Sequence, residues 1–203
     1  MTSLTNPVGK IRPFVFRLTR IFARLIFYLL FRIQVLGLEN IPEKGPFIIL
    51  PKHQRWEDIP ILGLVFQRPL YYIAKYELFK RPVFNWFLSS LGGIPLNRER
   101  PLESRQSLKM MLRLLGDGAR VVIFPEGTYY RGKMGPGHAG LLRMIFSRFD
   151  IPFIPVGIRY SKKRWRTQVK IAIGRTFGGN SFKNVNEIID YTLGEIGRLS
   201  GLC

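Results

Sequence analysis

The chain has 203 residues and 46% of them are hydrophobic, which is enough for one domain with a sizeable buried core. Lys and Arg number 32 against 13 Asp and Glu, so the formal net charge is +19. This excess favours an anionic partner: a nucleic acid, an acidic membrane surface, a phosphorylated substrate or an acidic carrier protein. Cys203 is the only cysteine, which excludes an intramolecular disulfide and a cysteine-based metal site.

The N-terminal part of the chain, from Ile11 to Val35, is apolar with interspersed arginines. As a helix it would carry Arg17, Arg20 and Arg24 on one face. A second face would hold the apolar side chains Leu18, Phe22, Leu25, Ile26, Leu29 and Ile33. The longest uncharged run, Leu25–Phe31, is far shorter than the roughly 18 apolar residues of a spanning helix. We predict an amphipathic helix that lies in the membrane interface. The alternative is an ordinary amphipathic helix packed on a sheet.

The remaining chain alternates strand patterns with helix patterns, after a turn-rich connection between Gly37 and Gly45. The expected strands cover residues 47–50, 71–74, 94–96, 121–124, 153–158 and 169–173. The expected helices cover residues 58–66, 82–91, 102–115, 141–149 and 185–199. This alternation predicts an α/β fold with one largely parallel sheet that is covered by helices on both faces. We therefore predict a membrane-associating segment at 1–36 and a single globular domain at 37–203.

The stretch Lys-His-Gln-Arg-Trp-Glu-Asp at 52–58 follows the apolar run 47–50 and Pro51. His53 is therefore expected on a loop at the carboxyl end of a buried strand, where open α/β sheets bind ligands. Asp58 is expected at the start of the next helix, with Pro60 in its first turn. A carboxylate beside an imidazole fixes its tautomer, so the pair could act as a general base on a hydroxyl. Alternatively, Asp58 only caps the helix and His53 is a polar loop residue.

Four blocks in the sequence resemble the glycerolipid acyltransferases, and most of all their bacterial 1-acylglycerol-3-phosphate branch. They are the His-x4-Asp pair of His53 and Asp58, and the segments 93–98 (Gly-Ile-Pro-Leu-Asn-Arg), 124–128 (Phe-Pro-Glu-Gly-Thr) and 151–156 (Ile-Pro-Phe-Ile-Pro-Val). They span about half of the chain and follow the order of the family. In the first block this chain has Lys52 and Arg55 where the family often has Asn and Ser.

The resemblance implies substrate-binding roles at the ends of further strands. Arg98 is the strongest candidate for a phosphate, because its guanidinium can bind two oxygens at once. Lys75 is a second candidate, and either could instead be a solvated surface charge. The resemblance implies acceptor binding by Glu126 and Thr128, with Gly127 allowing a tight turn between them. Alternatively, or in addition, Glu126 forms an ion pair that stabilises this turn.

The resemblance implies transfer of a fatty acyl group from acyl-CoA or acyl-carrier protein to the hydroxyl of lysophosphatidate, at the cytoplasmic face of the cell membrane. There is no Gly-x-Ser-x-Gly sequence and Cys203 is terminal, so we expect direct attack by the acceptor without an acyl-enzyme. No metal and no cofactor are expected. The alternatives are another acceptor, such as glycerol 3-phosphate or a lyso-aminolipid, and a non-catalytic basic protein that binds a membrane or nucleic acid. No nucleic-acid-binding motif accompanies the charge.

Overall fold

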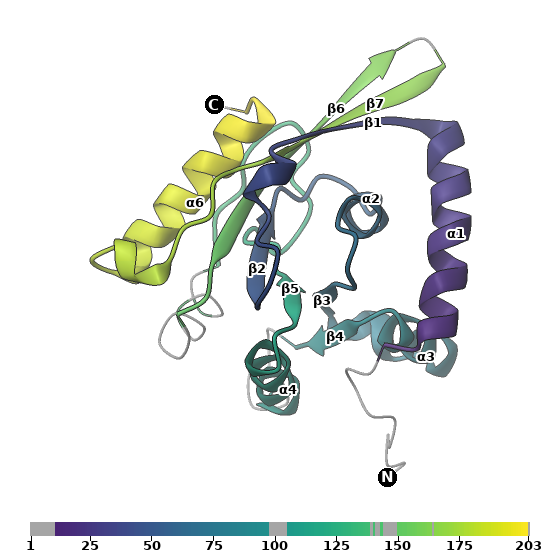
Figure 1. Ribbon diagram of the computed structural model, residues 1–203, viewed down its shortest axis with the longest axis horizontal. Coiled ribbons are helices and arrows are strands. Elements are labelled where there is room, and N and C mark those ends of the chain that lie inside the picture. The colour runs from purple at the N-terminus through teal and green to yellow at the C-terminus, as the bar shows by residue number, and fades with distance from the viewer. Residues whose placement is uncertain are drawn as a thin grey trace.

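A computed structural model describes residues 11–97, 105–138, 140, 143, 150–163 and 165–202. Its centre is a seven-stranded sheet in the order β1-β7-β6-β2-β5-β3-β4 (Figure 1). The strands are β1 (Phe31–Leu36), β2 (Phe47–Pro51), β3 (Tyr71–Lys75), β4 (Gly93–Leu96), β5 (Arg120–Val122), β6 (Phe153–Lys163) and β7 (Arg166–Ile173). The helices are α1 (Pro13–Leu30), α2 (Asp58–Val65), α3 (Pro82–Ser90), α4 (Arg105–Gly116) and α6 (Val185–Ser200). All neighbouring strands are parallel except β6 and β7, so the predicted α/β fold with a largely parallel sheet is confirmed.

Alternate side chains of the central strand β2 enter two separate cores. Phe47 and Ile49 pack in the core that also holds side chains of α1 and α2. Ile48 and Leu50 pack in the core that holds side chains of α4 and α6. A strand that is buried on both faces must be apolar at every position, which explains its uninterrupted apolar sequence. Helices therefore cover both faces of the sheet, as predicted.

The N-terminal helix is shorter than the helix predicted for Ile11 to Val35. It ends at Leu30, and Phe31–Leu36 forms the edge strand β1, which pairs in parallel with β7. Inward and outward side chains alternate along β1, as expected for a strand with one covered face. Residues 31–36 thus belong to the sheet and not to the N-terminal helix. Among the described residues, no helix has the length and apolar content that crossing a membrane requires.

The pair β6 and β7 is a long antiparallel hairpin that extends beyond the rest of the sheet (Figure 1). The first part of β6 pairs with β2, whereas its outer part pairs with β7 alone. The apolar pattern predicts an end of this strand at Ile158, five residues before its observed end at Lys163. Most of the outer part is exposed and polar, so it lacks the apolar run that marks a buried strand.

Candidate active site

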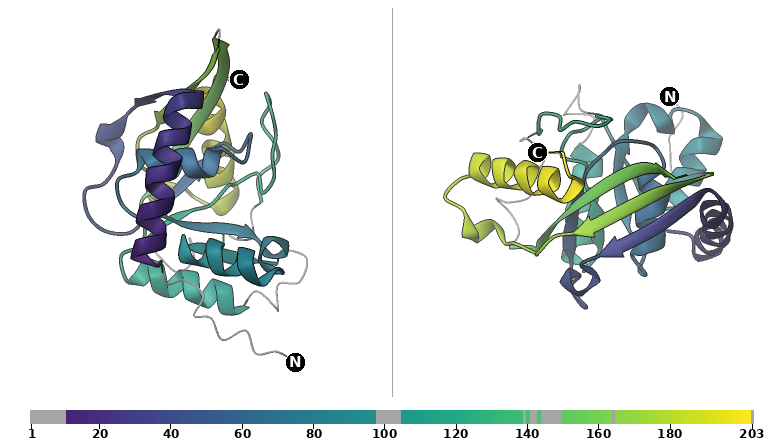
Figure 2. Two further views of the ribbon diagram at one scale, coloured as in Figure 1. Left: turned by 90° about the vertical axis from the view of Figure 1, so that its right-hand side faces the viewer. Right: turned by 90° about the horizontal axis from the view of Figure 1, so that it is seen from above.

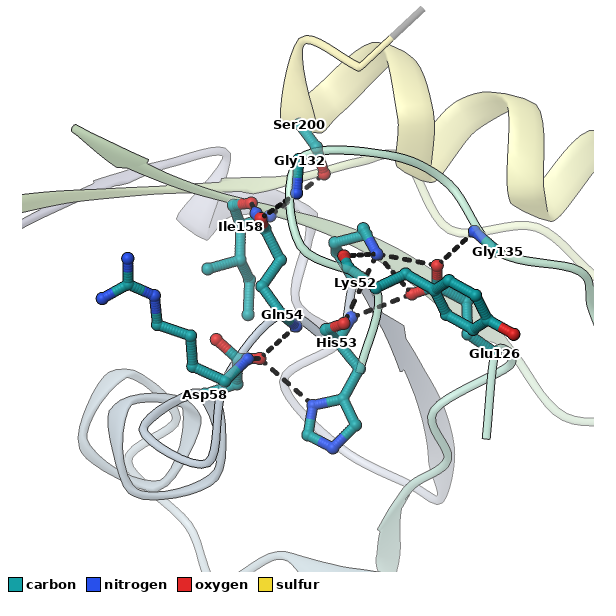
Figure 3. Close-up of polar contacts among 11 residues, drawn as sticks. Lys52, His53, Gln54, Asp58, Glu126, Gly132, Gly135, Ile158 and Ser200 are labelled. Carbon is teal, nitrogen blue, oxygen red and sulfur yellow. Dashed lines mark hydrogen bonds and ion pairs between the residues drawn. The ribbon is translucent and has the colours of Figure 1, made fainter. Parts of the chain in front are cut away.

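The loop that joins β2 to α2 brings His53 and Asp58 together. Nδ1 of His53 lies 3.1 Å from Oδ2 of Asp58, at the carboxyl end of β2 (Figure 3). Parallel strands on both sides of β2 place this loop at the edge of the sheet where ligands bind in such folds. The predicted contact between the two side chains is therefore present.

Asp58 is fully buried, and its carboxylate accepts hydrogen bonds from the loop before it. The backbone N–H groups of Gln54 and Arg55 donate to Oδ2 at 2.6 Å and 2.8 Å. The residue at the N-cap of α2 is Glu57, and Asp58 is the first residue of the helix. The alternative in which Asp58 only caps the helix is therefore wrong. These two hydrogen bonds fix the position of the Asp58 carboxylate relative to the imidazole of His53.

Tyr160 completes this arrangement from β6, and it is not among the residues predicted for the site. Its hydroxyl donates to Oδ1 of Asp58 at 2.6 Å, across 102 positions of sequence. Burial, and next the negative charge of Asp58, raise the pKa of Tyr160 well above that of an ordinary tyrosine. The hydroxyl therefore stays protonated and remains a donor. Arg55 lies over the ring of Tyr160, with its guanidinium carbon 4.5 Å from the ring centroid.

The imidazole of His53 is mostly buried between aromatic rings. It stacks on Phe124 with 3.7 Å between the ring centroids, and Tyr129 lies 4.3 Å away at a steeper angle. If Nδ1 carries the proton that is shared with Asp58, Nε2 is left unprotonated and can accept a proton. The ring is thus oriented from two sides, by Asp58 and by the aromatic walls.

A buried ion pair connects this loop to the Phe-Pro-Glu-Gly-Thr segment. Nζ of Lys52 lies 2.7 Å and 2.8 Å from the two carboxylate oxygens of Glu126, and both side chains are almost completely buried (Figure 3). Lys52 also donates to the carbonyl of Tyr130, and Glu126 accepts from the backbone N–H groups of His53 and Gly135. The ion pair considered as an alternative role of Glu126 is therefore present. Acceptor binding by Glu126 stays a prediction.

Gln54, which is also not among the predicted site residues, makes a second connection between the two loops. Its side-chain amide donates to the carbonyl of Ile158 at 2.6 Å, and its side-chain oxygen accepts from the N–H of Gly132 at 3.0 Å. These bonds join the loop of His53 to β6 and to the glycine-rich segment after Thr128. Apart from the polarity of a residue beside His53, no sequence signal predicts them.

The other predicted binding residues lie around this site or outside the described residues. Gly127 has a φ of 71°, which confirms the tight turn expected there, and Thr128 is exposed. Lys75 ends β3 with its side chain 71% exposed, and its Nζ lies 3.8 Å from Glu77. Arg98 lies outside the described residues. The phosphate-binding roles of Lys75 and Arg98 therefore stay predictions.

The sequence profile of the acyltransferase family matches residues 32–159, from β1 to the middle of β6. The chain belongs to the acyltransferase family. The match confirms the resemblance carried by the four sequence blocks, and it includes both members of the His53–Asp58 pair.

The curated proteins that are similar to this chain are named for different acyl acceptors. The 1-acyl-sn-glycerol-3-phosphate acyltransferase of Pseudomonas aeruginosa is 39% identical over 146 residues, which are 70% of this chain and 53% of that protein. The lyso-ornithine lipid O-acyltransferase of the same organism is 30% identical over 157 residues, 77% of this chain and 58% of that protein. The chain spans about half the length of the curated relatives it matches.

The crystal structure of the 1-acyl-sn-glycerophosphate (LPA) acyltransferase from Thermotoga maritima has the same fold as this acyltransferase-family chain. The TM-score is 0.74 at 28% sequence identity, and the alignment covers 93% of this chain and 79% of that one. The single α/β domain with helices on both faces of a mostly parallel sheet is thus a feature that the two proteins share.

Proposed function

We propose that this protein transfers a fatty acyl group from a thioester, acyl-CoA or acyl-carrier protein, to the free hydroxyl of lysophosphatidate. The observation that carries the proposal is the 3.1 Å contact between His53 and a buried Asp58, at the carboxyl edge of a parallel sheet. A neutral imidazole with one nitrogen on a carboxylate has the second nitrogen available as a general base. The relatives named for lysophosphatidate acylation support this choice of reaction.

In the proposed reaction, Nε2 of His53 takes the proton of the acceptor hydroxyl as its oxygen attacks the thioester carbonyl. The resulting tetrahedral intermediate collapses with cleavage of the carbon–sulfur bond, and the thiolate takes the proton back from the imidazolium. Asp58 stabilises the imidazolium between these two steps. No group on the protein becomes acylated, so a single active-site base is sufficient.

The choice of acceptor needs a direct test, because a relative named for lyso-ornithine lipid matches 77% of this chain, against 70% and 71% for two relatives named for 1-acylglycerol 3-phosphate. Purified protein in detergent should release free thiol from acyl-CoA or acyl-carrier protein only when an acceptor is added. Lysophosphatidate, lyso-ornithine lipid and glycerol 3-phosphate should be compared in parallel. If none of the three acceptors causes release of free thiol, the acyltransferase proposal is refuted and a non-catalytic basic protein is favoured. Release with lyso-ornithine lipid alone would refute lysophosphatidate as the acceptor.

For a phosphate-bearing acceptor, we expect Arg98→Ala to lower kcat/KM about 10–150-fold, the value of one lost charged hydrogen bond. Arg98 follows β4, three strands from β2, so about 14 Å separates the two strand axes. Arg98→Lys should recover only part of the loss, because an ammonium cannot bind two oxygens in one plane. Equal losses for lysophosphatidate and its dephosphorylated analogue would contradict the phosphate role.

Tyr160→Phe tests whether the third member of the arrangement supports the base. The variant removes one donor from the carboxylate of Asp58 and leaves the ring that Arg55 covers. We expect kcat/KM to fall about 10-fold, because a hydrogen bond to a charged group is worth roughly 1.5–3 kcal/mol and Asp58 keeps its other partners. Wild-type kcat/KM in folded Tyr160→Phe would show that this hydrogen bond does not support the base.

The membrane association proposed for this protein is supported by the outer face of α1. One side of the helix packs on the domain through Phe27, which is buried. The opposite side leaves Ile21 and Leu25 about two-thirds exposed, at 65% and 60%. Exposed apolar residues flanked by arginines are typical of helices in the membrane interface. Peripheral attachment at the cytoplasmic face through α1 should appear as co-sedimentation with anionic vesicles.

A further inference from the structure

A second apolar surface lies on α3 and on the short helical turn before it. The exposed side chains are Leu78, Val83, Phe84, Trp86 and Phe87, and together they are named the α3 face. Val83 is 76% exposed and Phe84 is 54% exposed, although both belong to a helix. Bulky apolar side chains that gather on a surface mark a site of contact with a protein or a membrane.

The helix that carries the α3 face lies beside the N-terminal end of α1. The backbone N–H of Arg12, just before α1, donates to the carbonyl of Ser90 at the end of α3. The guanidinium carbon of Arg12 also lies 5.6 Å from the ring centroid of Trp86. Figure 1 and the left view in Figure 2 place α3 beside one end of α1 and on the same side of the molecule. The two helices can therefore touch one flat surface.

The charges around the α3 face identify the chemistry of its partner. Exposed Lys75, Lys80 and Arg81 stand at its border, and the sole acidic residue between positions 75 and 87 is Glu77, which pairs with Lys75. Aromatic side chains beside lysine and arginine fit the interface of an anionic bilayer. Contacts between proteins are instead depleted in lysine. The composition therefore favours a lipid surface over a second copy of the chain.

We propose that the α3 face is a second membrane contact that fixes the orientation of the domain. A domain attached through one helix can still rotate about the axis of that helix, and a second contact beside it removes this freedom. Trp56 lies three residues after His53 and packs edge-on against Phe27 of α1, with 6.3 Å between centroids. The orientation set by both contacts thus determines where the catalytic loop meets the lipid. The inference rests on the proposed membrane association and not on the proposed acyl transfer.

The test is binding of the full chain to vesicles of phosphatidylcholine with and without phosphatidylglycerol, followed by co-sedimentation. Val83→Gln combined with Phe84→Gln should lower the partition coefficient at least about 10-fold, since two exposed apolar side chains lose their burial in lipid. Leu36→Gln combined with Leu38→Gln is the control, because these apolar side chains are also exposed, at 43% and 53%, but lie at the end of β1 and in the short helical turn Leu38–Asn40. This control should bind like the wild type.

Charge is tested separately with Lys80→Gln combined with Arg81→Gln. Binding to vesicles with phosphatidylglycerol should fall about fivefold for each charge removed. Binding to phosphatidylcholine alone should not change. The control pair Arg175→Gln and Lys183→Gln lies in the segment between β7 and α6, on the other side of the domain, and should have a smaller effect (Figure 1).

Trp86 reports insertion directly once Trp56→Phe and Trp165→Phe have removed the other two tryptophans. Its fluorescence should be quenched by brominated lipids in the vesicles. Absence of quenching, or wild-type binding by Val83→Gln with Phe84→Gln, would overturn the inference. Self-association that this double variant abolishes while vesicle binding persists would show that the face joins two copies instead.

Two further measurements separate this inference from the other proposals. Ile21→Gln combined with Leu25→Gln tests α1 alone. If vesicle binding falls in only one of the two double variants, the surface that carries those substitutions is the one that binds. Acyl transfer to lysophosphatidate in detergent micelles should be the same for Val83→Gln with Phe84→Gln as for the wild type. An inactive wild type in this assay would refute the acyl transfer and leave the vesicle result standing.

Discussion

Replacement of His53 should lower kcat/KM for acyl transfer by about 10²–10⁴-fold, the usual contribution of a general base. The ring of His53 is also buried against Phe124, so His53→Ala removes packing as well as the base. His53→Gln keeps much of the volume and tests the base more cleanly. The measurement is the rate of thiol release, together with circular dichroism and thermal unfolding of each variant.

His138→Ala is the matched control for this experiment. His138 is the other histidine of the chain and lies exposed in the glycine-rich segment, so its removal should leave kcat/KM unchanged. Wild-type turnover by folded His53→Gln would mean that another group takes the proton of the acceptor.

Asp58→Asn should lower the activity less than replacement of His53 does. An asparagine side-chain oxygen at the position of Oδ2 can still accept from Gln54 and Arg55. Its NH2 group would then lie at the position of Oδ1 and can donate to the hydroxyl of Tyr160. The geometry is thereby retained, and the lost factor is the negative charge that stabilises the imidazolium.

Replacement of Lys52 should have the largest effect on stability, with a loss of about 3–5 kcal/mol in the free energy of unfolding for Lys52→Met. The substitution leaves the carboxylate of Glu126 buried with two backbone donors and no opposite charge. Since domains of this size are stable by only about 5–15 kcal/mol, urea unfolding should show a clear shift of the midpoint.

Lys75→Met is the control, because the ion pair of Lys75 with Glu77 is long and mostly exposed. Such pairs contribute about 0–1 kcal/mol. Lys52→Met combined with Glu126→Gln should recover part of the lost stability, because the uncompensated charge is then absent. Equal stability of Lys52→Met and Lys75→Met would show that the buried pair does not hold the two loops together.

The sequence by itself predicted the central strands and placed His53 and Asp58 where they could meet. The apolar run 47–50 had to be a buried strand because every one of its residues avoids water, and β2 confirms this. His53 and Asp58 are five positions apart, so a strand end followed by a helix start is enough to bring them together. Local patterns suffice where the residues that interact are neighbours in sequence.

The strand β1 lies at the limit of what the sequence can show. Phe31-Arg-Ile-Gln-Val alternates apolar and polar side chains, which is a strand signal. The signal follows a helical pattern without a turn residue between them, so the helix was extended over it. Pairing with β7, more than 130 positions later, decides its structure.

Only the tertiary structure decided which distant groups complete the site. Tyr160 reaches Asp58 across 102 positions, and Lys52 reaches Glu126 across 74. Both contacts depend on the order β6-β2-β5, which places the three strand ends side by side. Strand order is set by the packing of the whole sheet and leaves no trace in the local spacing of residues. The same holds for α3, whose apolar sequence is that of a core helix and whose position at the edge leaves it exposed.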